Sequence, residues 1–161
     1  MELVEILRGI KEAGIRHVVV GGVAANAHGS PRITMDVDIC YEPSSENRER
    51  LARLLARWHA YLRGVEPGLP LLLDARALLD SPVLTLTTDL GDVDVMHQVE
   101  GIGAYQKVEA ASVDGTMLGV PIKVLALDAL ISAKKAAGRR KDLEALLELE
   151  ALREERRRRG V

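Results

Sequence analysis

The stretch from Gly21 to Asp38 constrains the fold of this chain more than any other segment. It follows the β-branched run His17-Val18-Val19-Val20, which is typical of a buried strand. Two glycines then end the strand, and an Ala-rich segment of about two helical turns runs on until Gly29-Ser30-Pro31 stops it. Residues 34–41 alternate polar and apolar side chains with the period of a strand. The sequence therefore predicts strand, short helix and strand in close succession.

Periodic patterns predict further elements along the rest of the chain. Helices are expected at about residues 3–13, 44–61, 101–107, 127–137 and 143–157, and strands at 83–88, 92–97, 113 and 120–124. The link Asp89-Leu90-Gly91 predicts a hairpin, and Asp114-Gly115 predicts a turn between the last two strands. Residues 64–70 are rich in turn formers, and residues 71–79 have no assignable pattern.

Together these elements predict an α+β fold, a mixed β-sheet with flanking helices and a C-terminal helical segment. The length of 161 residues is typical of a single domain. We expect that domain to span residues 1–161, with its core at about 15–125 and the C-terminal helices at about 126–159.

Composition excludes several classes of protein. Aromatic residues make up 2% of the chain and Phe is absent, which disfavours rows of base-stacking rings. A net charge of −2 excludes a uniformly basic coat for nucleic acid. The single Cys40 cannot form an internal disulfide, and the acidic start Met1-Glu2-Leu3-Val4-Glu5 is unlike a signal peptide. The apolar runs are far shorter than a membrane span, so we expect a cytoplasmic protein with no membrane partner.

Three aspartates carry the chemistry that the sequence suggests. Asp36 and Asp38 are separated by one residue on a predicted strand, so their side chains share a face, roughly 7 Å apart along the chain. Two carboxylates on one face repel each other unless a cation lies between them, and such an oxygen-rich pair suits Mg²⁺. Asp94, bracketed by valines on another strand, supplies a third acid, with Asp92 on the same face as the fallback.

The paired glycines fit a phosphate-binding turn. Gly21 and Gly22 let the backbone approach a triphosphate, and the following helix offers unpaired N–H groups to anions. A dinucleotide site is the alternative, because Glu42 lies about twenty residues beyond Gly22. We reject it, because the Gly-x-Gly-x-x-Gly spacing is absent and Pro31 shortens the helix below a normal crossover.

Gly-Gly, a gap of thirteen residues, Asp-Val-Asp and a later strand acid resemble the polymerase β-like nucleotidyltransferase superfamily. The likeness is to its small prokaryotic members, which include minimal nucleotidyltransferases and AbiEii-type toxin–antitoxin proteins. The resemblance implies that Gly21 and Gly22 cradle the phosphates of an NTP. It implies that Asp36, Asp38 and Asp94 are catalytic and bind two Mg²⁺ ions, with Mn²⁺ as a possible substitute.

The reaction implied by this resemblance moves a nucleoside monophosphate from the NTP to a hydroxyl acceptor. That acceptor is an RNA end, a protein side chain or a small molecule. The family often has Ser at the position of Gly22, so the chain departs from the pattern there.

Several cationic positions extend the likeness or flank the acids. The resemblance continues through residues 120–143 and implies that Lys123 and Lys134 lie near the nucleotide. Arg32 is either a phosphate ligand or a solvated loop cation. The cluster of Lys134, Lys135, Arg139, Arg140 and Lys141 is either a basic helix end or a patch for polyphosphate or nucleic acid.

An alternative function is a non-catalytic or regulatory component of a toxin–antitoxin pair. In this interpretation the nucleotide site is vestigial or regulatory, and the Leu-rich, charged C-terminal helix suits a partner protein. The leucines of that helix are either core or a subunit contact, and the second case would make the protein an oligomer. A weaker option is RNA binding through the basic end, Arg156 to Arg159.

Overall fold

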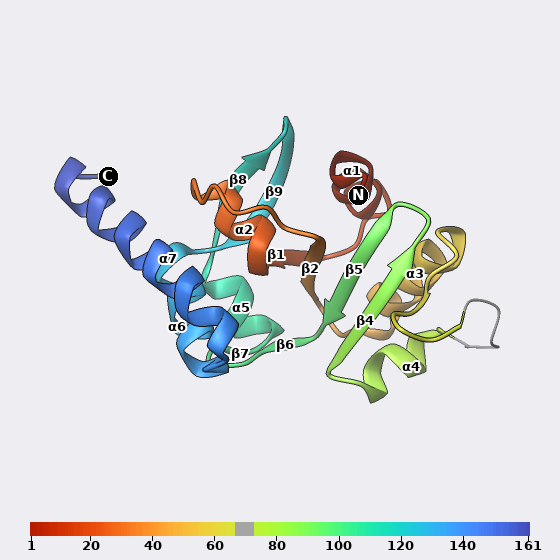
Figure 1. Cartoon of the computed structure of the whole chain (residues 1–161). Helices are drawn as coiled ribbons and strands as arrows, with labels where there is room; N and C mark the ends of the chain where they lie inside the picture. The colour runs from red at the N-terminus through yellow and green to blue at the C-terminus, as the bar shows by residue number, and fades with distance from the viewer. Residues whose placement is uncertain (67–72) are drawn as a thin grey trace.

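The computed structural model describes residues 1–66 and 73–161 (Figure 1). Within these residues the main sheet is mixed and seven-stranded, in the order β3-β4-β5-β2-β1-β9-β8. Its strands are β1 (His17–Val20), β2 (Asp36–Tyr41), β3 (Tyr61–Leu62), β4 (Val83–Thr88), β5 (Gly91–Met96), β8 (Ser112–Met117) and β9 (Val120–Leu125). A separate two-stranded ribbon is formed by β6 (Gln98–Val99) and β7 (Gly103–Ala104).

Helices lie around the sheet and at both of its ends. They are α1 (Leu3–Glu12), α2 (Gly21–Ala27), α3 (Ser45–Arg57), α4 (Ala75–Asp80), α5 (Tyr105–Ala110), α6 (Leu127–Ala137) and α7 (Arg140–Arg159). In Figure 1, α3 and α4 lie beside the β4–β5 end, whereas the blue helices α6 and α7 lie together at the other end. Of the helices described, none combines the length and the apolar character that a membrane crossing requires.

Local chemistry explains where several helices begin and end. The Ser44 side chain accepts a hydrogen bond from the Asn47 N–H and so caps α3, and Asp74 caps α4 in the same way. Helix α6 stops at Gly138, whose φ of 59° is a left-handed conformation that glycine adopts without strain. The tight turn that follows lets α7 fold back against α6.

The register around β2 determines where the acidic side chains lie. β2 pairs antiparallel with β1 and parallel with β5, which places Asp36 opposite Asp92 and Asp38 opposite Asp94. Side chains alternate along each strand, so the intervening valines and isoleucine are buried in the core: Val37, Ile39, Val93 and Val95. The acids consequently share the other face of the sheet.

The α+β class and the mixed sheet with flanking helices are confirmed. So is the hairpin, since β4 and β5 pair antiparallel from Val83↔Met96 to Thr88↔Gly91. The predicted turn at Asp114-Gly115 is wrong, because both residues lie inside β8 and pair with β9. The reversal falls at Leu118 and Gly119, which both have positive φ, where glycine is the favoured residue.

Other boundaries also differ from the expectations. The helix expected over 44–61 ends at Arg57, because the chain reverses at His59 (φ 51°) and Tyr61 begins β3. In the segment 101–107, β7 precedes α5, so the helix begins only at Tyr105. Within residues 71–79, α4 starts at Ala75, whereas residues 67–72 lie outside the described part of the chain.

Candidate metal and nucleotide site

Three carboxylates from two strands meet on one face of the sheet. Asp36 and Asp38 come from β2 and Asp94 from β5, and one carboxylate oxygen of each lies within 4.8 Å of the others. The side chain of Asp94 is only 15% exposed. This juxtaposition follows from the parallel pairing of the two strands, which sets Asp38 directly beside Asp94.

Burial and mutual repulsion perturb two of these acids. The pKa of Asp38 is raised to about 8. Burial is the largest cause, followed by the negative charge of Asp36 and a hydrogen bond with Asp94. The pKa of Asp36 is raised as well, by burial and by the charge of Asp94. Burial and neighbouring negative charge both disfavour the ionised form of a carboxyl group, and a bound cation would offset them. A divalent cation with a preference for oxygen ligands would supply positive charge here, so these residues fit a Mg²⁺ or Mn²⁺ site.

Gly21 lets the start of α2 lie directly against Asp38. Its φ of +65° is left-handed, and a Cβ at this position would overlap Asp38 Oδ2 and lie 2.9 Å from Asp38 Cγ. A residue with a side chain would therefore be strained and would displace the carboxylate. The close backbone approach at this glycine is thus an approach to Asp38.

Gly22 is also closely packed. A Cβ on Gly22 would lie 2.7 Å from Thr34 Oγ1, and the Thr34 hydroxyl donates a hydrogen bond to the Asp36 carbonyl at 3.0 Å. Thr34 therefore takes up the space that a serine side chain would need. This packing gives a physical reason why the chain has glycine at this position.

Arg63, which the sequence analysis did not single out, lies among the acids. Its Nη2 donates to Asp94 Oδ1 at 2.7 Å, its Nε lies 3.1 Å from Asp92 Oδ2, and its Nη1 lies 3.9 Å from Asp36 Oδ2. Arg63 directly follows β3, a strand of only two residues with no detectable sequence period. No sequence signal places it there, because the contact depends on the packing of β3 at the edge of the sheet.

Cationic side chains at the α6–α7 junction line the same cavities as Asp38 and Asp94. Lys134 and Arg139 both donate to the buried carboxylate of Asp142, at 3.1 and 2.7 Å. Burial alone would raise the pKa of Asp142, but the hydrogen bonds from Arg139 and Lys134 hold that pKa below its ordinary value. Asp142 was not predicted, and it fixes two cations close to the acids.

Two cavities meet at the acids. Both are lined by Gly21, Asp38, Asp94, Lys134 and Arg139. The first, of about 400 Å³, lies toward β4, β6 and α6, and is lined largely by apolar side chains that include Val83, Met96, Val99 and Leu130. The second, of about 520 Å³, is more polar than the first and adds Gly22, Arg32, Thr34, Asp36 and Lys141. The acids thus stand between an apolar cavity and one lined by both cationic and acidic side chains.

Arg32 lines the second cavity but is already paired. Its guanidinium lies 2.8 Å from Glu148 and 3.2 Å from Glu144 on α7, and its side chain is 40% exposed. These ion pairs tie the loop after α2 to α7. Arg32 is therefore close to the acids, with its charge partly engaged by carboxylates.

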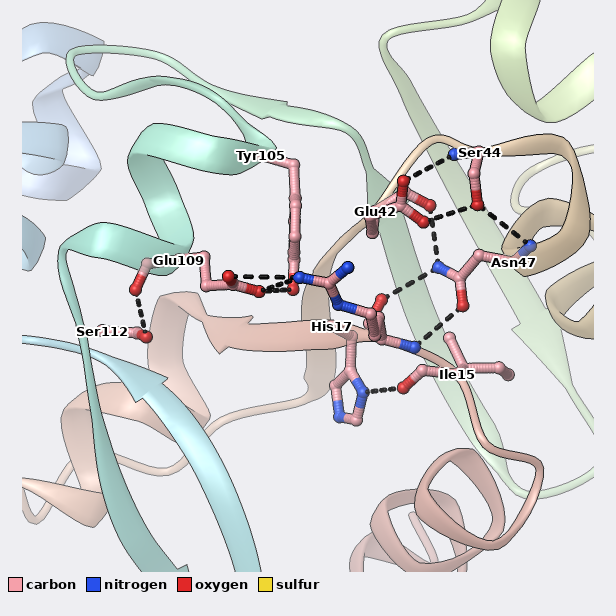
Figure 2. Close-up of polar contacts among 9 residues, drawn as sticks. Ile15, His17, Glu42, Ser44, Asn47, Tyr105, Glu109 and Ser112 are labelled. Carbon is pink, nitrogen blue, oxygen red and sulfur yellow. Dashed lines mark hydrogen bonds and ion pairs between the residues drawn. The ribbon is translucent and has the colours of Figure 1, made fainter.

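Lys123 is not brought to the acids. It is exposed on β9, two residues before Leu125, which lines the apolar cavity, and this offset is about 7 Å along a strand. Lys123 lines another cavity beside α5. Figure 2 shows this region, where Glu109 of α5 accepts hydrogen bonds from Tyr105 at 2.5 Å and from Arg16 at 3.0 Å.

Comparisons with known proteins agree with the geometry of the fold. No family model matches the sequence, and no curated protein is similar to it in sequence. Among solved structures, the chain is similar to ANT(2'')-Ia in complex with adenylyl-2''-tobramycin, with a TM-score of 0.61 and 15% identity over 99% of this chain and 97% of that one. It is also similar to the lincomycin-bound lincosamide antibiotic adenylyltransferase LnuA, with a TM-score of 0.64 and 12% identity over 94% and 96%.

These likenesses extend over nearly the full length of each chain. At 12–15% identity they establish the fold and leave residue roles open. The chain therefore has the fold of nucleotidyltransferases, as its motifs predicted.

Proposed function

We propose that this protein is a nucleotidyltransferase that moves a nucleoside monophosphate from an NTP to a hydroxyl acceptor. The observation that carries the proposal is the cluster of Asp36, Asp38 and Asp94, whose oxygens lie within 4.8 Å of one another on a nucleotidyltransferase fold. The cluster lies beside a cavity lined by Lys134, Arg139 and other cations, which suits the negative charge of a triphosphate.

In this proposal all three acids hold metal, and one of them has a second task. Asp36 and Asp38 hold metal, and Asp94 holds metal and helps to activate the acceptor hydroxyl. Two divalent ions, when bound, stabilise the attacking and the leaving oxygen of an in-line displacement at the α-phosphorus. The acceptor oxygen forms the new bond to phosphorus, the bond to the β-phosphate oxygen breaks, pyrophosphate leaves, and the hydroxyl proton passes to a carboxylate.

Positively charged and small residues would orient the nucleotide. Gly21 and Gly22 keep the backbone close to Asp38 and Thr34, so that phosphates can approach the acids without a side chain in the way. Lys134 and Arg139, held by Asp142, would contact phosphate oxygens across the cavity. Arg32 would do so after releasing one of its glutamate partners. Lys123 lies outside this proposed site.

The acceptor that best suits the cavities is a small molecule. The apolar cavity of about 400 Å³ is within the range of small-molecule sites, roughly 300–1,000 Å³, and opens on the acids. Both similar structures are of enzymes that act on antibiotics, one bound to lincomycin and the other to an adenylylated tobramycin. RNA ends and protein side chains are the other two acceptor classes, and the experiment below compares all three.

The test is label transfer from NTPs that carry the label on the α-phosphate. The protein is incubated with Mg²⁺ and each NTP, and with hydroxylated small molecules, total RNA or protein as acceptors. We expect transfer by the wild type and by Asp114→Asn, an exposed acid outside the site. Asp36→Asn and Asp38→Asn should abolish it. Transfer that persists in both variants would rule out the proposed acids as the metal site.

A regulatory component of a toxin–antitoxin pair is the second candidate. The observation in its favour is on α7, where Leu143 is 55% and Leu147 is 67% exposed, so the helix presents apolar surface to a partner. In that case the protein co-purifies with a neighbouring small protein, and NTP with Mg²⁺ produces no thermal shift. A thermal shift with NTP and Mg²⁺ in the protein alone favours the enzyme.

A further inference from the structure

Arg63 is anchored so that its charge stays over the acid cluster. Its backbone N–H donates to the Thr85 carbonyl at 3.0 Å, which continues the pairing of β3 with β4 by one residue. Its Nη2 also donates to the Leu86 carbonyl at 2.9 Å. Thr85 pairs with Asp94 in the next strand, so the Arg63 side chain crosses β4 to reach the acids.

The guanidinium then contacts three of the four acids on this face. It contacts Asp94 most closely, then Asp92 and Asp36, at 2.7, 3.1 and 3.9 Å. In residues 1–66 and 73–161, Arg63 is the only cationic side chain within ion-pair distance of these three acids. Lys134 and Arg139, the cations across the cavity, are paired with Asp142.

We propose that Arg63 is the built-in counter-cation of the acid cluster, and that a divalent cation binds the cluster in competition with it. The inference rests on the proposed metal site. Asp94 is central to the competition, because its Oδ1 is held by Arg63 and the same carboxylate belongs to the set within 4.8 Å. In this proposal the Arg63–Asp94 pair loosens when metal binds.

The size of the effect follows from Coulomb's law. At an assumed separation of about 6 Å, repulsion between a divalent ion and the guanidinium would weaken binding by about tenfold at the dielectric constant of water. The effective dielectric constant of a half-buried site is lower, so tenfold is the lower bound. Without metal, Arg63 offsets the repulsion among the acids, so its removal destabilises the metal-free protein.

The test measures Mn²⁺ affinity by calorimetry and unfolding in EDTA. Arg63→Gln removes the charge, Arg63→Lys keeps it, and Arg50→Gln removes a surface arginine that pairs with Glu46 on α3. We expect Arg63→Gln to bind Mn²⁺ at least about tenfold more tightly than wild type. In EDTA it should unfold at lower denaturant concentration. Arg63→Lys should lie near wild type in affinity, and Arg50→Gln should match wild type in both measurements.

The outcomes separate this inference from the proposed function. If wild type binds Mn²⁺ and Arg63→Gln binds it equally or more weakly, Arg63 positions Asp94 instead of competing with metal, and the inference is overturned. If neither protein binds Mn²⁺, the metal site and the competition both fail. If Arg63→Lys gains as much affinity as Arg63→Gln, the charge is not the cause, which also overturns the inference.

Discussion

Replacing Gly21 with alanine tests the close approach of α2 to the acids. Gly21 has a φ of +65°, and a Cβ there would overlap Asp38 Oδ2 and lie 2.9 Å from Asp38 Cγ. The substitution Gly21→Ala therefore combines two effects, an unfavourable backbone conformation and a steric conflict with a proposed metal ligand. The same substitution at a second left-handed glycine, where only the backbone effect operates, separates them.

Gly14 is that matched control. It follows α1 with a φ of +71°, and a Cβ there would meet nothing within 4 Å. Gly14→Ala should therefore lose only the left-handed backbone cost of about 1–2 kcal/mol, partly offset by about 0.4–1 kcal/mol from the restricted unfolded chain. Gly21→Ala has the same two contributions and adds overpacking, which typically costs about 1–3 kcal/mol.

The assay is denaturant unfolding combined with Mn²⁺ titration. We expect Gly21→Ala to lose about 1–3 kcal/mol more stability than Gly14→Ala and to bind Mn²⁺ more weakly, because Asp38 must rotate away from the other acids. In an Asp38→Ala background, which removes the overlapping atoms, the extra loss should shrink toward that of Gly14→Ala. Equal losses for the two glycine variants, together with unchanged Mn²⁺ affinity, would refute the reasoning.

Three further variants test other parts of the structure. Asp142→Asn removes the carboxylate, 4% exposed, that accepts from two cations, and should cost about 1–3 kcal/mol in denaturant unfolding; no loss means that the carboxylate does not hold them. Tyr41→Phe removes the buried hydroxyl that donates to the Leu78 carbonyl at 2.6 Å and should cost about 1–2 kcal/mol, whereas an unchanged midpoint contradicts this bond. Burial lowers the pKa of His17 from 6.5, so the unfolded chain binds its proton first and stability is lost as pH falls below that value. The fall in unfolding free energy between about pH 7 and pH 5 should be smaller in His17→Gln, and identical slopes would contradict the shift.

The strands around the acids were predictable because their signal is local. In β2 and β5, apolar and acidic residues alternate, and burial of Val37, Val93 and their neighbours fixes which face the acids occupy. The paired glycines that directly follow β1 likewise predict a turn with a close backbone approach. These features depend on a few neighbouring residues.

The remaining parts of the site depend on packing between distant segments. Arg63 reaches the acids from an edge strand of two residues, which leaves no periodic pattern in the sequence. Asp142 stands in a charged run that resembles a solvated helix end, and its burial arises only when α7 folds back on α6. Lys123 shows the reverse case, because its strand was predicted well but its position along that strand keeps it away from the acids.

The central claim is that Asp36, Asp38 and Asp94 together hold a divalent cation. A crystal structure of the protein grown with Mn²⁺ and a non-hydrolysable NTP tests it most directly, because manganese is located by its anomalous scattering. We predict an anomalous peak for a manganese ion that is coordinated by carboxylate oxygens of all three acids, with Arg63 withdrawn from Asp94. Manganese bound elsewhere on the nucleotide, with Arg63 still paired to Asp94 and no density among the three acids, would contradict the claim.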